Sequence, residues 1–325
     1  MTIKIVEAAK ENASAGFAFL FLVAVGVAKT LLTKFVFTHS PTPVAFSVLS
    51  CIATNICLLP ILIIQGEFRM LSCSQLANFT LICVAIGLDL GCQNVALAIL
   101  SIALQQCIKA TLPTMTVVVE SAIKRTCFHP LIYITVLAIC IGPVMVAYDS
   151  PWDSKSEVGS QAFGVIMMVV AMIGGAFKYV LCHHTIKEYQ GQMGVLAFTF
   201  WVELFVGAML TPWAIMNGEA EKLMYTEQST SAWALLWFTG AFGGVRVVAQ
   251  FYFLAKTSAT SLAISGIAMQ ALTIILGIFA FGDEVTNLLV GGVLATLVTS
   301  GFYAYIKTSK VLEPKVVQDN GKGLV

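Results

Sequence analysis

A lysine lies deep inside an apolar stretch of the chain, and a proline follows it one turn later. The stretch is Leu104–Glu120, the lysine is Lys109 and the proline is Pro113. An ammonium group in hydrocarbon is costly unless it is paired, hydrated or bound to a ligand, and proline removes the N–H that would bond the carbonyl four residues back. We therefore predict that Lys109 faces an aqueous cavity and binds an anionic solute. The alternative is a lysine that pairs with a neighbouring carboxylate to hold helices together.

Two further charged residues, Asp89 and Arg246, lie deep in other apolar segments. A guanidinium grips phosphate with two hydrogen bonds, while a lysine supplies a movable point charge. Together with Lys109 they predict a site for a phosphorylated small molecule, in which Asp89 keeps the empty site neutral. The polar residues expected to contact the sugar or base are Gln93, Tyr252 and Gln270. The alternative is an ion pair between Asp89 and Arg246 that closes the helix bundle.

The remaining charged residues of the apolar segments include Lys29, Lys34, Lys178 and Glu203. Lys34 and Lys178 are expected near the ends of their segments, where a long side chain can reach the membrane surface. Lys29 lies deeper, and the sequence leaves its role open.

Two enzyme patterns are present only in part. Gly87-Leu88-Asp89 with Tyr148-Asp149 weakly resembles the paired aspartates of presenilin-type intramembrane proteases, but the order is reversed and Asp149 falls at the membrane edge. His183-His184 is expected in a solvated loop without a carboxylate or cysteine at metal-ligand spacing. The sequence therefore predicts a protein that is not an enzyme and that has no metal ion and no cofactor.

The composition is that of an all-α polytopic membrane protein embedded in a lipid bilayer. Of 325 residues, 58% are hydrophobic and only 11% are charged, which is too few charges for a soluble chain of this length. The formal net charge is +1, and no basic run is present that would bind nucleic acid.

Windows of about 20 apolar residues predict ten membrane spans. The expected spans are 13–37, 43–65, 75–98, 102–122, 130–148, 160–182, 193–215, 232–255, 259–281 and 286–306. The side that holds the N-terminus has eleven lysines and arginines, against three on the other side. Basic residues concentrate on the cytoplasmic side of membrane proteins, so both termini are expected in the cytosol.

An internal repeat supports the same architecture. A shift of 157 residues places Gly87 on Gly244 and Ser101 on Ser258, and it places Asp89 on Arg246. Because each copy has five spans, the second copy crosses the membrane upside down, and such inverted repeats bind substrate between them near the midplane. We predict one transporter domain with repeat one at about 13–148, repeat two at about 160–306 and a cytosolic tail at 307–325.

The segment Ile108–Pro113 resembles the Lys-Ala-x-x-Pro turn in the fourth span of the triose-phosphate translocator and nucleotide-sugar transporter branch of the drug/metabolite transporter superfamily. Phe281–Thr286 is similar to the short link between the last two spans of that family. The resemblance implies that Lys109 contacts the substrate phosphate. It also implies that Arg246 stands where plastid members contact substrate through tyrosine, and that Gln93 occupies a polar third-span position.

The chain departs from both branches of that family in the ninth span. Met269-Gln270 replaces the Lys-Arg pair of phosphate exchangers, and Gly266–Gln270 replaces the GDP-mannose motif. We therefore expect an antiporter of phosphorylated organic anions, with a nucleotide sugar exchanged for a nucleoside monophosphate as the leading class. The absence of a transit or signal peptide favours a Golgi or ER membrane. A sugar-phosphate or phosphoenolpyruvate exchanger and a non-transporting membrane scaffold are the alternatives, and glycine-rich helix faces leave room for a homodimer.

Overall fold

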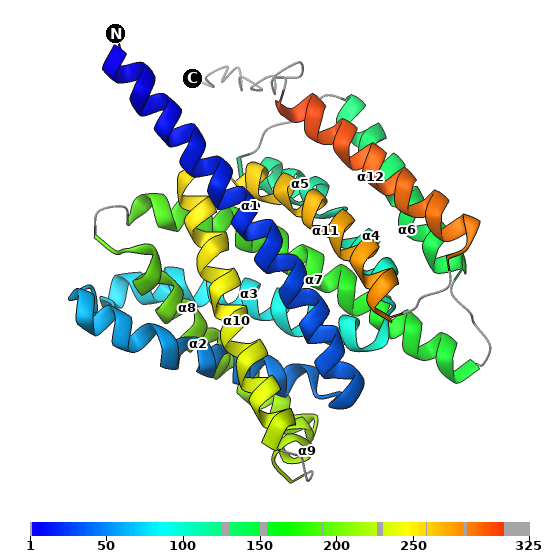
Figure 1. Cartoon of the computed structure of the whole chain (residues 1–325), viewed down its shortest axis with the longest axis horizontal. Coiled ribbons are helices and arrows are strands. Elements are labelled where there is room, and N and C mark those ends of the chain that lie inside the picture. Colours follow the sequence, from blue (N-terminus) through cyan, green and yellow to red (C-terminus); the bar gives the residue numbers. More distant parts are fainter. Residues whose placement is uncertain are drawn as a thin grey trace, which may run out of the picture.

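The computed structural model describes residues 2–124, 130–149, 155–189, 192–225, 230–257, 259–281 and 285–308, and these form twelve helices and no strand (Figure 1). The helices are α1 (Thr2–His39), α2 (Pro43–Gln65), α3 (Cys73–Ile99), α4 (Ile102–Lys109), α5 (Leu112–Lys124), α6 (Pro130–Asp149), α7 (Lys155–Glu188), α8 (Val195–Met216), α9 (Glu219–Tyr225), α10 (Thr230–Lys256), α11 (Ala259–Phe281) and α12 (Asn287–Thr308).

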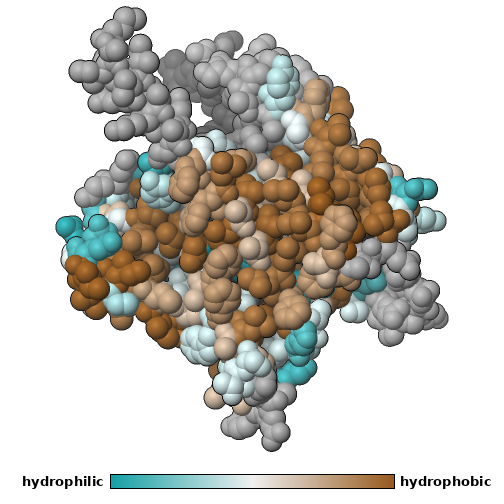
Figure 2. Space-filling model, in the orientation of Figure 1, coloured by the Kyte–Doolittle hydropathy of each residue, from teal (hydrophilic) through white to brown (hydrophobic). Residues whose placement is uncertain are grey.

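The helices have the length and hydropathy of membrane spans. Seven stretches of the described residues are long and apolar enough to cross a bilayer, and α11 and α12 contain shorter apolar stretches. The pair α4–α5 forms one crossing, so that ten crossings arise from all helices except the short α9. Apolar residues cover most of the face on which α1 and α10 lie, and hydrophilic residues gather toward its rim (Figure 2). The predicted all-α polytopic membrane fold is confirmed.

Three helix bounds differ from the predicted ones. The first helix begins at Thr2, and the seven-residue helix α9 lies between the predicted spans 193–215 and 232–255. The third difference corrects the expected loop at His183-His184, because α7 continues through both histidines to Glu188. No glycine or proline occurs between His183 and Glu188 to end the helix there.

The internal repeat is visible in the helix bounds themselves. When the bounds of α3 are shifted by 157 residues they become 230–256, which are the bounds of α10. The same shift carries the start of α4 and the end of α5 onto the start and end of α11, and the start of α6 onto the start of α12. The outer limits 13–148 and 160–306 of the two repeats stay predictions, and residues 309–325 of the expected tail lie outside the described residues.

The helices of one repeat pack mainly against those of the other. Helix α3 packs against α7 as its counterpart α10 packs against α1, while α2 meets α8 and α6 meets α12. The last pair lies side by side at one end of the molecule in Figure 1. Each helix of one repeat thus contacts a helix of the other repeat, and equivalent helices make equivalent contacts, as expected of two inverted repeats that pack against each other.

Glycines allow the closest of these approaches. A methyl group added at Gly174 of α7 would lie 2.8 Å from the carbonyl oxygen of Ala85 in α3. A methyl group at Gly292 of α12 would lie 2.8 Å from the carbonyl oxygen of Gly142 in α6. Backbone-to-backbone packing of this kind requires small residues, and it fixes which turns of the paired helices face each other.

The break expected at Pro113 is present. Helix α4 ends at Lys109 and α5 starts at Leu112, with the Thr111 hydroxyl donating to the Ile108 carbonyl at 2.7 Å. The hydroxyl of Ser300 in α12 donates to the carbonyl of Ala110 at 3.4 Å and so helps to satisfy the opened backbone. In the second repeat the 157-residue shift places Gln270 at the position of Pro113, and α11 runs through it unbroken. Gln270 keeps the N–H that proline lacks.

Lys34 does not reach toward the membrane surface as expected. Its ammonium donates to the carbonyl oxygens of Leu97 and Leu100 at 2.9 and 2.8 Å, at the C-terminal end of α3. The last carbonyls of a helix lack internal donors and carry partial negative charge, so a cation is stabilising there. Lys34 therefore fixes the end of α3 against α1.

Candidate functional site

Asp89 of α3 is paired with Lys178 of α7. The two side chains form an ion pair, and each is 9% exposed. This corrects the expectation that Lys178 lies near a membrane surface, and it rules out the alternative considered from the sequence, in which Asp89 pairs with Arg246. The close contact of the two helices explains the pairing, since a methyl group at Gly175 would lie 3.2 Å from Oδ1 of Asp89. Lys178 follows Gly174 by one helical turn and thus reaches the same level of α3.

Lys109 is buried at the helix break and has no carboxylate partner among the residues that the structure describes. The residue is 5% exposed. Within the described part of the chain its ammonium makes no hydrogen bond and no ion pair. The charged groups within electrostatic reach of it are Arg246, Asp89, Lys178 and Lys29. The one carboxylate of this group, Asp89, is already paired with Lys178. A cation held in this way is poised for an external anion.

Arg246 lies on the inner face of α10. Thr239, Gly243 and Gln250, which are spaced at helical intervals from it, are all buried, and Arg246 itself is half-buried. Among the described residues its guanidinium makes no ion pair. Arg246 is the strongest electrostatic neighbour of Lys109. The structure thus brings together the two cations that the sequence predicted for the site.

Lys29 of α1 is a third buried cation of this region. It is 6% exposed, and its ammonium lies 5.8 Å from the centre of the Phe46 ring. A methyl group added at Gly243 of α10 would lie 3.5 Å from its Cε, and Arg246 is its strongest charged neighbour. Sequence reasoning left Lys29 open. Helix α1 packs against α10 as α7 packs against α3, so Lys29 and Lys178 lie on equivalent helices, but the 157-residue shift places Lys29 on Ile186 and gave no signal for it.

Gln93 and Gln270 are buried as expected of site residues. Gln93 is 8% exposed, and its backbone carbonyl accepts a hydrogen bond from Gln105 at 3.2 Å. Gln270 is 1% exposed, and its side-chain oxygen has no hydrogen-bond partner within the described residues. A buried amide oxygen without a partner is costly. Gln270 lies in α11, which packs against α4 and α5, so its free oxygen is on the helix that faces the Lys109 break.

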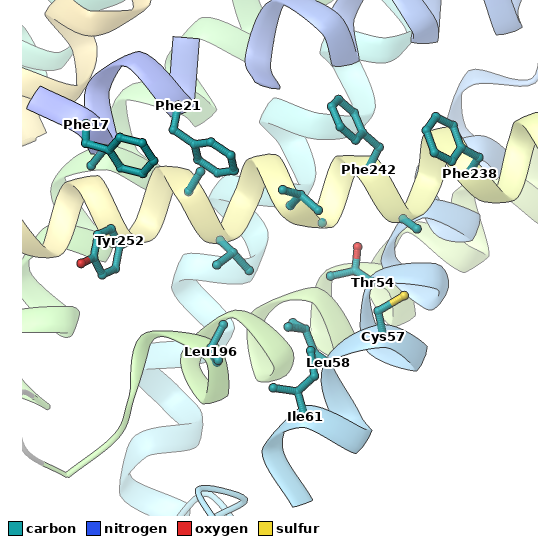
Figure 3. A pocket seen from close by; sticks show the side chains of 16 residues that line it. Phe17, Phe21, Thr54, Cys57, Leu58, Ile61, Leu196, Phe238, Phe242 and Tyr252 are labelled. Atoms are coloured by element: carbon teal, nitrogen blue, oxygen red, sulfur yellow. The ribbon is translucent and has the colours of Figure 1, made fainter. Parts of the chain in front are cut away.

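Tyr252 lies apart from the other predicted residues. It is 44% exposed and lines a groove of about 720 Å³ on the outside of the bundle, between α1, α2, α8 and α10. In Figure 3 it sits at one end of this groove, whose walls carry Phe17, Phe21, Phe238 and Phe242. Its ring lies 5.0 Å from the ammonium of Lys256. Tyr252 is six residues beyond Arg246, which places it on a different face of α10.

The charges between the repeats favour an anion. The buried and half-buried charged residues of this region are Lys29, Asp89, Lys109, Lys178, Glu203 and Arg246, so four cations face two carboxylates. No group of histidine, cysteine and acidic side chains that could hold a metal ion occurs among the described residues. The arrangement is suited to hold a multiply charged anion by electrostatic attraction and hydrogen bonds.

Comparison with known proteins agrees with this architecture. Residues 162–304 match the model of the EamA-like transporter family. The match supports the drug/metabolite transporter superfamily and indicates a membrane transporter, but it does not distinguish the triose-phosphate and nucleotide-sugar branch. One solved crystal structure is similar with a TM-score of 0.60 and 12% sequence identity, covering 92% of this chain and 99% of that chain. This likeness shows the fold. No curated protein sequence matches the chain.

Proposed function

We propose that this protein is a secondary transporter that exchanges phosphorylated organic anions by alternating access. The observation that carries the proposal is the group of three buried or half-buried cations, Lys29, Lys109 and Arg246, none of which has an ion-pair partner within the described chain. Because isolated cations at membrane depth are costly, their retention indicates a negatively charged cargo. The helix break places one of them at a point where the backbone itself is open.

The leading cargo is a nucleotide sugar exchanged for the matching nucleoside monophosphate, in a Golgi or ER membrane with both termini in the cytosol. In this assignment Lys109 and Arg246 bind the phosphate groups. Gln93 and Gln270 contact the sugar or base, and the free side-chain oxygen of Gln270 is suited to accept from a hydroxyl or an amino group. Tyr252 is left out of the cargo site because of its position in the outer groove.

A sugar-phosphate or phosphoenolpyruvate exchanger is the second candidate. The chain has Met269-Gln270 where phosphate exchangers have a Lys-Arg pair. Lys29 replaces part of that lost positive charge, because it provides a third cation beside Arg246. A small, highly charged phosphate ester requires such a concentration of positive charge. The two candidates differ in how strongly inorganic phosphate competes, since the nucleotide-sugar assignment expects weak competition.

The experiment is an exchange assay with purified protein in liposomes. The vesicles are loaded with one member of a panel and offered the same labelled compound outside; the panel consists of UMP, GMP, CMP, AMP, their nucleotide sugars, phosphoenolpyruvate, 3-phosphoglycerate and inorganic phosphate. We expect exchange of at least one member at a rate well above that of protein-free vesicles. If the folded protein exchanges none of them and none raises its melting temperature, the protein is a scaffold rather than this carrier.

A further inference from the structure

The outer groove that contains Tyr252 takes no part in the cargo site described above. Helix α10 runs along this groove, with α1 on one side of it and α2 and α8 on the other (Figure 3). Among the lining residues of α10, Val245 and Tyr252 are 43% and 44% exposed. A contiguous exposed apolar surface marks a contact with the membrane or with another protein.

The dimensions of the groove distinguish between these two kinds of occupant. Along α10 the lining residues extend from Phe238 to Tyr252, which is about 21 Å at 1.5 Å per residue. The volume of about 720 Å³ therefore corresponds to a mean cross-section of about 35 Å². An α-helix with its side chains is about 10 Å across and needs roughly twice that area. Hydrocarbon chains fit the groove, and a transmembrane helix of a partner does not.

The walls of the groove are apolar along most of its length. Two pairs of stacked aromatic rings line it, Phe17 with Phe21 on α1 and Phe238 with Phe242 on α10. Aromatic rings provide a large apolar contact area. The hydroxyl of Thr54 also lines the groove, but it donates to the Ser50 carbonyl of its own helix at 2.7 Å. The middle of the groove is therefore suited to a hydrocarbon chain.

One end of the groove carries a hydroxyl and a positive charge. Tyr252 lies at this end in Figure 3, and exposed Lys256 follows it by one helical turn at the end of α10. The ammonium of Lys256 lies 5.0 Å from the centre of the Tyr252 ring. Tyrosine and lysine near the end of a membrane helix lie at the level of the lipid headgroups. A lipid chain in the groove thus brings its headgroup beside a cation, which attracts a negative headgroup.

We propose that this groove binds an anionic phospholipid, with an acyl chain along α10 and the phosphate group beside Lys256 and Tyr252. The bound lipid contacts helices from both halves of the chain, α1 and α2 from the first and α8 and α10 from the second. In the orientation given under the proposed function, this end of the groove lies in the cytosolic leaflet, where anionic lipids concentrate. The lipid site itself depends neither on that orientation nor on the cargo.

The test is lipid binding to the full-length protein in detergent, measured by native mass spectrometry. Dioleoylphosphatidylserine and dioleoylphosphatidylcholine are titrated separately, because they have the same chains and differ in net charge. We expect one phosphatidylserine to bind about fivefold more tightly than phosphatidylcholine, as one lysine at a membrane surface provides. Lys256→Gln should remove this preference, and Lys256→Arg should retain it. Val245→Trp fills the groove and should weaken the binding of both lipids.

Matched changes outside the groove serve as controls. Lys187→Gln removes an exposed lysine near the end of α7, and Val298→Trp adds a ring on the exposed surface of α12. Both variants should bind the two lipids as the wild type does. Equal affinities of the wild type for the two lipids, or an unchanged preference in Lys256→Gln, would overturn the proposal.

A thiol in the groove provides a readout that needs no variant. Cys57 lines the groove and is exposed, and Cys140 of α6 is exposed elsewhere on the surface. Added phosphatidylserine should slow the modification of Cys57 by N-ethylmaleimide several-fold and leave the rate at Cys140 unchanged. An unchanged rate at Cys57 at lipid concentrations that saturate binding would place the lipid elsewhere and refute the assignment. None of these measurements involves the cargo, so their outcome is independent of the exchange assay.

Discussion

Asp89 and Arg246 occupy equivalent positions of the two repeats but carry opposite charges and have different surroundings. A shift of 157 residues superimposes the bounds of their helices, α3 and α10. Asp89 forms an ion pair with Lys178, while a charged neighbour of Arg246 is a second cation, Lys29, on the helix that packs against α10. One half of the molecule is thus neutral at this level and the other is positive. The positive half is the part of the proposed site that an anion would complete.

Replacement of Lys109 tests the central cation. We expect Lys109→Ala to lower exchange about 100-fold, because a hydrogen bond to a charged group contributes about 1.5–3 kcal/mol and each 1.4 kcal/mol is tenfold in affinity. The melting temperature should not fall, since the variant removes a buried cation that has no carboxylate partner in the described part of the chain. Exposed Lys187 supplies the control Lys187→Ala. Exchange at the wild-type rate by a folded Lys109→Ala protein would refute the assigned role.

Arg246 is predicted to bind phosphate through its guanidinium fork. Arg246→Gln should raise the KM for the cargo about 10-fold or more, and it should weaken the decrease of uptake with rising salt. Arg246→Lys keeps the charge without the planar fork and should have an intermediate KM. Initial rates at a series of cargo and salt concentrations check both effects. An unchanged KM and salt dependence for Arg246→Gln would show that the guanidinium does not contact the cargo.

The ion pair between Asp89 and Lys178 is predicted to stabilise the contact of α3 with α7. Asp89→Asn leaves Lys178 buried without a counter-charge and should cost about 3–5 kcal/mol of stability, and Lys178→Gln should have a similar cost. The double variant removes both charges, so it should be more stable than either single variant. Thermal unfolding in detergent measures the four proteins of this cycle. Additive losses in the double variant would contradict the pairing.

Pro113 is predicted to serve transport at the expense of helix continuity. Pro113→Ala restores an N–H that can bond the Lys109 carbonyl, so the α4–α5 segment should become continuous like α11, with an equal or higher melting temperature. Exchange should fall at least about tenfold, because the turn that carries Lys109 is no longer open. Pro60, an exposed proline inside α2, provides the control Pro60→Ala. An active Pro113→Ala protein with wild-type kinetics would show that the break is dispensable.

The sequence predicts the architecture well because the bilayer imposes simple rules. Hydropathy located the helix ends within a few residues except at the start of α1 and at both ends of α7, and the shift found from a few identities reproduces the helix bounds of α3 and α10. The break at Pro113 followed from the missing N–H of proline. The spans and the helix break depend on residues within the segment itself, so the sequence of that segment is enough to predict them.

The pairing of charges was harder to predict because it depends on contacts between distant helices. Lys178 was placed near a membrane surface, but the glycines at 174 and 175 bring α7 against α3 and carry Lys178 to Asp89. Lys34 bonds the end of α3 for a similar reason. Tyr252 lies on α10 with Arg246 but faces the outer groove. Polarity alone cannot distinguish the two residues, because it does not show which face of the helix each one occupies. The glycine positions were the usable signal for this contact of α7 with α3.

The helix break occurs in one repeat and is absent from the other, where α11 continues through Gln270. Two inverted copies with identical backbones would give outward-open and inward-open conformations of equal energy. Here the first copy is interrupted after Lys109 and the second is continuous through Gln270, so the twofold axis that relates the repeats does not make the two conformations equivalent. For the carrier proposed above, we therefore expect the resting state to favour one orientation and the apparent affinity for cargo to differ between the two faces of the membrane.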